Sequence, residues 1–146
     1  MYAIGGMSLV PMFDPMASVE RLDVADLASV REAAARLAAQ PIDVLVHNAG
    51  ALTADRRTAP SGLELVVASQ VVGPFLLTSL LLDRLRQHAP GRVITMSSGG
   101  MYASPLRVDD LQMGDDYKGS EFCSGLLFGI SGSSLVLQLG REILQL

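Results

Sequence analysis

The sequence predicts an α/β fold in which a parallel sheet is flanked by helices. Strand-like and helix-like segments alternate along the chain, and the segments at 42–47 and 92–98 are almost continuously apolar, as expected of strands covered on both faces. Crossovers of helical length between such strands give parallel pairing with right-handed connections. The 146 residues, 49% hydrophobic and 18% charged, suit one domain with a sizeable core.

Capping signals and apolar spacing define the elements in the first half of the chain. Residues 1–16 have no clear period, and a short strand is expected at about 18–22. Asp26 is a good N-cap for an amphipathic helix over 27–39, which ends at the following proline. The strand at 42–47 comes next.

The second half of the chain begins with a long helical stretch over 62–87. We expect it to be bent near Pro74, because proline lacks the backbone donor that a helix interior requires. The strand at 92–98 follows. Over 120–140 the composition turns rich in serine and glycine, with one charged residue. Two interpretations of this tail stay open, a divergent helix and a foreign end produced by a frameshift or fusion.

Composition and charge exclude several classes of function. A net charge of −4, a pI near 5.0 and a single lysine give no support to nucleic-acid binding. One cysteine excludes an internal disulfide, and the two histidines lack ligand spacing, so we expect no metal site. The N-terminus lacks the basic region of a signal peptide, and we expect a cytoplasmic location.

Two uncharged runs approach the length of a bilayer span, 65–82 and 122–140. Neither has flanking basic asymmetry or an aromatic belt, so we do not expect the protein to span a membrane. The first run is interpreted as a buried helix of the α/β fold. For the second, a membrane-associated segment stays open as an alternative.

Polar residues follow each of the three predicted strands. Asp23 ends the first, Asn48, Ala49 and Gly50 follow the second, and Ser98 closes the third. In open parallel sheets, ligands bind beyond the carboxyl ends of the strands. Ala49 and Gly50 would also let a ligand approach the backbone closely. The alternative is that Asn48 merely ties a strand end to a turn.

Three stretches, "LDVAD", "VLVHNAG" and "RVITMSSGGMY", resemble in order and spacing the short-chain dehydrogenases/reductases. The sequence "SSGGM" is similar to that of the dehydrogenase/reductase member 12-like branch. The resemblance implies an incomplete Rossmann-like parallel sheet with flanking helices, in a single partial NAD(P)-binding domain over 1–146. The chain is family-like over 17–122 and atypical over 123–146. The implied reaction is oxidation of a small-molecule alcohol or reduction of a carbonyl with NAD or NADP.

The resemblance also implies roles for individual residues. Asp23 corresponds to the acidic residue near the adenine of the cofactor, with the backbone of Val24 beside it. The Asn48–Gly50 motif would steady the central sheet and line the cofactor ribose. Ser98 corresponds to the catalytic serine, which orients the substrate and supports a developing oxyanion. Gln70 stands where many members place a catalytic asparagine.

The chain departs from the family where the proton chemistry is carried. The family's tyrosine and lysine are spaced Y-x-x-x-K, so that the lysine lowers the pKa of the phenol. None of Tyr2, Tyr102 and Tyr117 has a lysine four residues on, and the aligned positions hold Cys123 and Leu127. We therefore expect the 146-residue chain to be catalytically impaired.

A second departure lies at the amino end. The family's glycine-rich turn, which places backbone donors against the pyrophosphate, has only Gly5 and Gly6 in its place. Two strands of a full sheet are also missing, which leaves open strand edges. We expect a homo-oligomer in which these edges and the 62–87 helix contact another subunit. The alternative function is a non-catalytic remnant that acts only through such contacts.

Overall fold

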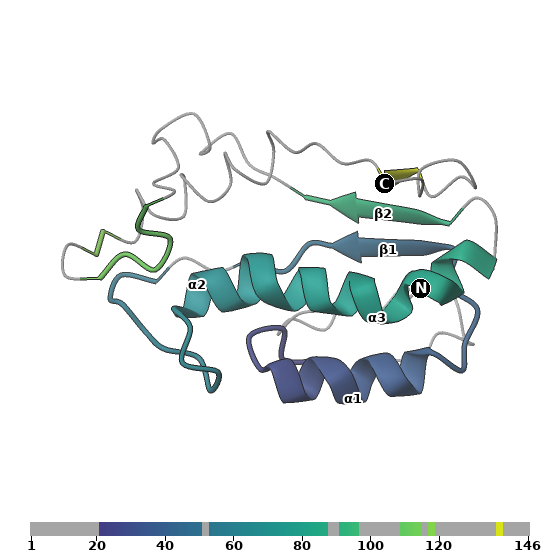
Figure 1. Ribbon diagram of the computed structural model, residues 1–146, viewed down its shortest axis with the longest axis horizontal. Coiled ribbons are helices and arrows are strands. Elements are labelled where there is room, and N and C mark those ends of the chain that lie inside the picture. Colours follow the sequence, from purple (N-terminus) through teal and green to yellow (C-terminus); the bar gives the residue numbers. More distant parts are fainter. Residues whose placement is uncertain are drawn as a thin grey trace, which may run out of the picture.

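The structure, a computed structural model, describes residues 21–50, 53–87, 91–96, 109–114 and 117–118, together with the backbone of 137–138. In this part of the chain a sheet has the strand order β1 (Val44–His47), β2 (Arg92–Thr95), β3 (Leu137–Gln138). Helix α1 (Leu27–Leu37) lies beside helix α3 (Gly73–Gln87), and both run against the direction of β1 and β2 (Figure 1). The predicted α/β class is confirmed.

Strands β1 and β2 pair in parallel, as predicted. Their register runs from Val44 opposite Arg92 to His47 opposite Thr95. The ladder also includes a hydrogen bond from the Met96 amide to the carbonyl of His47, at 2.9 Å. One long helical crossover joins the two strands, which is the connection that parallel pairing requires. The last predicted strand residues, 97–98, lie outside the described residues.

The first predicted strand is not found where the described chain begins. Residues 18–20 lie outside the described part, and Arg21 and Leu22 belong to no strand. Leu22 is nevertheless buried in the main core cluster. Its apolar character is explained by packing under α1 rather than by a place in a ladder, and the prediction of a strand at these two positions was wrong.

Helix α1 forms where the spacing predicts it. The carboxylate of Asp26 accepts a hydrogen bond from the Ala28 amide at 2.9 Å and caps the helix, as expected. The helix ends at Leu37, two residues before the predicted end. Its apolar face packs on three fully buried leucines of α3, Leu77, Leu81 and Leu85. Burying a leucine side chain contributes about 1.5–3 kcal/mol, so this contact is the centre of the core.

The long helix after β1 has three parts. It begins at Leu65 as α2 (Leu65–Val67), widens into the π-helical segment η1 (Ala68–Val72) and continues as α3. The Gly73 amide reaches back five residues to the carbonyl of Ala68, which is the π-type bond. Pro74 has no amide to give to the carbonyl four residues earlier. The predicted interruption near Pro74 is therefore confirmed, as a widened turn.

The two faces of the sheet differ in how far helices bury them. Leu45 and Val93 point toward α1 and α3 and are buried. On the opposite face Val44, Val46 and Ile94 stay 37–41% exposed. The continuous apolar runs predicted helices on both faces. Within the residues that the structure describes, both long helices pack on the same face.

The tail contributes one short strand in the described part. Leu137 and Gln138 form β3, which pairs antiparallel with β2. A helix through these two positions, one interpretation of the tail, was therefore wrong for them. The remainder of 123–146 lies outside the described residues.

One helix in the described part, Leu65–Gln87, is long and apolar enough to cross a bilayer by length and composition. Core helices of soluble proteins pass the same test. Here Leu77, Leu81 and Leu85 have no exposed surface and lie in the core cluster with α1 and the sheet. This packing agrees with the interpretation of 65–82 as a buried helix.

Candidate functional site

The carboxyl ends of β1 and β2 and the starts of α1 and α2 meet at one edge of the molecule (Figure 1). We call this the carboxyl edge. It follows directly from the topology, because β1 and β2 run toward this edge and the helices run away from it. All predicted cofactor residues lie at this edge, while Ser98 lies outside the described residues.

The turn that carries Asp23 is shaped by its own side chain. The carboxylate of Asp23 accepts from the Ala25 amide at 2.9 Å, and the Asp23 amide donates to the hydroxyl of Ser29 at 3.1 Å. Asp23 itself is exposed and Val24 is buried. The carboxylate is thus held at the surface of the carboxyl edge, where a ligand could meet it.

The turn is pressed against the long helix at Gly73. A Cβ added to Gly73 would lie 2.0 Å from the carbonyl oxygen of Val24, closer than any side chain can approach. A glycine is therefore required at this position for the backbone of the turn to touch the helix. This contact fixes the predicted adenine-side residues relative to the π-helical segment.

The Asn48–Gly50 motif leaves β1 beside the same segment. Asn48 and Gly50 are exposed and Ala49 is half-buried. The side-chain amide nitrogen of Gln70, in η1, lies 3.8 Å from the position of a Cβ on Gly50. The long helix thus touches the Asp23–Val24 turn at Gly73, the first residue of α3, and carries Gln70 beside the Asn48–Gly50 motif. Within the described residues, no hydrogen bond joins Asp23 to Asn48.

His47 ties the end of β1 to α3. Its Nε2 lies 2.8 Å from the hydroxyl oxygen of Thr78, and that hydroxyl donates to the carbonyl of Pro74, also at 2.8 Å. Thr78 has a single proton and gives it to Pro74, so its oxygen accepts from His47. The imidazole is therefore protonated on Nε2, which leaves Nδ1 as an acceptor.

Burial keeps this imidazole neutral. Desolvation lowers the pKa of His47 from 6.5 to about 4. The neutral imidazole offers its Nε2–H as a donor to the Thr78 hydroxyl. Thr78 was missed by the sequence reasoning. Its only signal was the spacing of four residues from Pro74, which lets a threonine hydroxyl reach that carbonyl.

Cofactor atoms would meet backbone and small side chains here. Asn48 and Gly50 are exposed, and among the described residues that are not its chain neighbours only the Gln70 amide nitrogen would lie within 4 Å of a Cβ on Gly50. Among the described residues, no three His, Cys, Asp or Glu side chains gather in a metal-binding group.

Comparison with known proteins identifies the family. The family model described as short chain dehydrogenase matches residues 13–106, more than half of the chain. Mouse (Mus musculus) retinol dehydrogenase 13 is 38% identical over 100 residues, which cover 67% of this chain and 30% of that protein. Polyprenol dehydrogenase of Danio rerio is 43% identical over 97 residues, 62% of this chain and 30% of that protein.

Solved structures agree with these relatives. A short-chain dehydrogenase from Streptomyces avermitilis superposes with a TM-score of 0.54 at 28% identity, covering 78% of this chain and 40% of that chain. An uncharacterized protein from Mycobacterium paratuberculosis gives a TM-score of 0.60 at 29% identity, covering 73% of this chain and 38% of its own.

The chain thus spans about a third of the length of the curated relatives that it matches. Bovine retinol dehydrogenase 12 is 35% identical over 116 residues, 77% of this chain. The family predicted from the sequence is confirmed, and the relatives are those of the retinol dehydrogenase 12-like branch. The chain belongs to the short chain dehydrogenase family, whose members are oxidoreductases with a Rossmann-like fold that generally bind NAD or NADP.

Proposed function

We propose that the chain supplies the central part of the cofactor site of an NAD(P)-dependent oxidoreductase. One observation carries the proposal. The Asp23–Val24 turn and the Asn48–Gly50 motif, which are far apart in sequence, lie along the same stretch of the long helix. The turn touches this stretch at Gly73, and the motif lies beside Gln70. A ligand lying along the carboxyl edge would meet both. The family resemblance assigns these two pieces to the adenine and ribose ends of one dinucleotide.

The substrate class follows from the relatives. Retinol and polyprenol, the alcohols named for the curated relatives, are both apolar isoprenoid alcohols. We therefore infer that the oxidoreductase acts on the hydroxyl or carbonyl of an apolar, isoprenoid-type substrate. The cofactor, when bound, accepts or supplies the hydride, and Ser98 would orient the substrate oxygen.

The 146-residue chain by itself is expected to turn over little or no substrate. Hydride transfer needs a proton partner, and the sequence has no Y-x-x-x-K pair. General acid–base catalysis is worth about 10²–10⁴-fold, so its loss would bring the rate below detection. Absorbance of the reduced nicotinamide should stay at blank with retinol, retinaldehyde or a short polyprenol. Turnover that Ser98→Ala abolishes would contradict this expectation.

Cofactor affinity offers a separate test. Without the glycine-rich turn, several charge-assisted hydrogen bonds to the pyrophosphate are lost, at about 1.5–3 kcal/mol each. Calorimetry with NADH and with NADPH should give binding weaker than micromolar for both. Micromolar binding of either cofactor would show that other residues hold the pyrophosphate.

An alternative function, action only through oligomer contacts, is favoured by one surface. Phe75 on α3 is 72% exposed and Leu80 is 45% exposed, although both are large and apolar. We expect a dimer or larger oligomer by light scattering after size exclusion, and Phe75→Gln should shift it toward monomer. A single peak at 15.5 kDa with a cooperative thermal transition would argue against this alternative.

A further inference from the structure

A buried carboxylate, that of Glu64, caps the start of the long helix and is not among the residues assigned to the cofactor site. Glu64 has no exposed surface and is the single buried charged side chain within the described ranges. One carboxylate oxygen, Oε2, accepts from the amides of Val66 at 2.7 Å and Val67 at 2.9 Å. It therefore acts as the helix N-cap, a position where glutamate is uncommon.

The second oxygen faces a residue far along the chain. The phenol of Tyr117 donates to Oε1 of Glu64 over 3.5 Å, and its oxygen lies 2.5 Å from the hydroxyl of Thr53. Either hydroxyl can donate in the contact between Thr53 and Tyr117. The three groups form a continuous polar chain that ends on the carboxylate, and a buried carboxylate requires polar partners of this kind.

Two further polar side chains, those of Gln112 and Arg56, join the same two segments. The side-chain oxygen of Gln112 accepts from the Glu64 amide at 2.8 Å. The Nε of Arg56 donates to the carbonyls of Gln112 at 3.2 Å and Met113 at 3.1 Å. A guanidinium shared between two carbonyls fixes their direction as well as their position.

Apolar packing completes the contact. Met113 is 5% exposed and packs with Val66 and Val67, and Tyr117 packs on the same cluster. Met113 has a φ of 42°, in the left-handed region that a side chain rarely adopts. This conformation persists only where the surroundings hold it.

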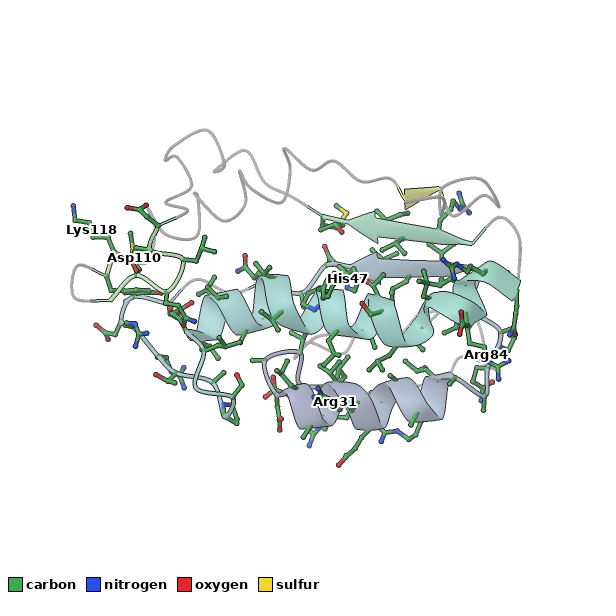
Figure 2. The ribbon with its side chains drawn as sticks, viewed as in Figure 1. Arg31, His47, Arg84, Asp110 and Lys118 are labelled. Carbon is green, nitrogen blue, oxygen red and sulfur yellow. The ribbon has the colours of Figure 1, made fainter. Side chains whose placement is uncertain are left out.

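We propose that residues 109–114 and 117–118 form a strap that Glu64 and Arg56 clamp to the start of the long helix, and that the strap opens as a unit separate from the core. Figure 2 shows Asp110 and Lys118, both in the strap, at the end of the molecule opposite Arg84 on α3. Because residues 97–108 join β2 to the strap and include Ser98, the clamp fixes the far end of that connection. The inference does not rest on the proposed catalytic function.

Hydrogen exchange of the full chain, followed by mass spectrometry, tests the proposal. Tyr117→Phe removes the phenol that links Thr53 to Glu64. Losing a hydrogen bond of this kind should raise exchange of strap peptides about 3–10-fold. Peptides from α1 and α3 serve as internal standards and should keep the wild-type rate. Equal acceleration of strap and core peptides would overturn the proposal, as would no acceleration at all.

Arg56 and its neighbour Arg57 allow a matched comparison. Arg57 is also exposed, and its side chain makes no hydrogen bond to the strap in the described part of the chain. Arg56→Ala should raise exchange of strap peptides about tenfold, because the charge-assisted bond that its Nε–H shares between two carbonyls is lost. Arg57→Ala should leave it unchanged. Identical exchange in the two variants would show that the clamp is not the source of the strap's position.

Glu64→Gln tests the contact of Glu64 with Tyr117 separately from its role as the helix cap. The new side chain keeps one oxygen for the helix amides and replaces the other by a nitrogen that cannot accept from Tyr117. Its strap exchange should match that of Tyr117→Phe, and the double variant should add little to either. Fully additive effects would mean that Glu64 and Tyr117 act independently, contrary to the proposal.

Discussion

The two ends of the helix over 65–87 are built by different means. Its later part, α3, buries Leu77, Leu81 and Leu85 against α1 and the sheet. Its first part, α2 and η1, is preceded by a buried Glu64 and is held by polar contacts to residues near 53 and 117. The later part of the helix is thus an apolar core element. The first part is a junction held by polar contacts to segments that are distant in sequence.

The difference explains where this fold is stable and where a site can form. Apolar packing needs no particular partner orientation, so a periodic leucine pattern suffices to specify it. A network of hydrogen bonds, by contrast, depends on donors and acceptors at fixed distances. The carboxyl edge, with its widened helix and neutral histidine, is of the second kind, as expected for a binding region.

Truncating a leucine at the apolar end should have the largest effect. Leu81→Ala removes a fully buried side chain and should lower the free energy of unfolding by about 2–5 kcal/mol. Leu80→Ala, one residue earlier and 45% exposed, is the matched control and should cost well under about 1 kcal/mol. Urea denaturation measures both. Equal losses would mean that the helix is packed differently.

Gly73→Ala tests the contact between the helix and the Asp23–Val24 turn. The added methyl would fall on the Val24 carbonyl oxygen, so the turn must move, and we expect a loss of about 3 kcal/mol. Gly114→Ala is the control, because a Cβ there meets nothing within 4 Å. Thermal unfolding of both variants checks the difference. A neutral Gly73→Ala would show that the turn does not touch the helix.

The neutral His47 predicts a dependence of stability on pH. The pKa of His47 is about 4 when folded and 6.5 when unfolded, so the unfolded chain binds the proton first as pH falls. Stability should decline between pH 6.5 and pH 4, by about 2 kcal/mol after allowance for partial exposure. His47→Asn should lose less over this window. Parallel curves for the two proteins would contradict the assignment.

Thr78→Val should have the smallest effect of the series. It removes the acceptor of the His47 Nε2 proton in nearly the same volume, and because His47 is only partly buried, we expect a loss of about 1 kcal/mol. Ser79→Ala is the control, since within the described residues the exposed Ser79 hydroxyl bonds only the Phe75 carbonyl in its own helix. Unfolding at pH 7 measures both. If Thr78→Val is as stable as Ser79→Ala, the contact with His47 contributes nothing to stability.

Sequence reasoning predicted the parts of the fold that depend on period and capping. The helix at Asp26, the parallel strands and the interruption before Pro74 all follow from local residue types. The strand at 18–22 was wrong at Arg21 and Leu22, because an apolar residue there packs under α1 instead of joining a ladder. Local pattern does not distinguish these two outcomes.

Some residues of the candidate site could likewise be proposed from the sequence, and others could not. Asp23, Val24 and the Asn48–Gly50 motif were predicted at the carboxyl edge because ligands of open parallel sheets bind there, and their role in cofactor binding stays a prediction. Thr78 and the Glu64–Tyr117 contact were not found. Glu64 and Tyr117 are 53 residues apart, and no periodicity links a capping glutamate with a tyrosine in a distant loop. Such pairs become visible only once the chain is folded.

A map of cofactor contacts by NMR tests the central claim most directly. In a uniformly ¹⁵N-labelled chain, addition of NADH or NADPH should shift the amides of Val24, Asn48, Ala49, Gly50 and Gln70, with affinity weaker than micromolar. Amides of Leu81 and Leu85, in the apolar part of the helix, should stay in place. Shifts confined to other parts of the molecule, or no shift at any cofactor concentration, would contradict the assignment of the carboxyl edge as the cofactor site.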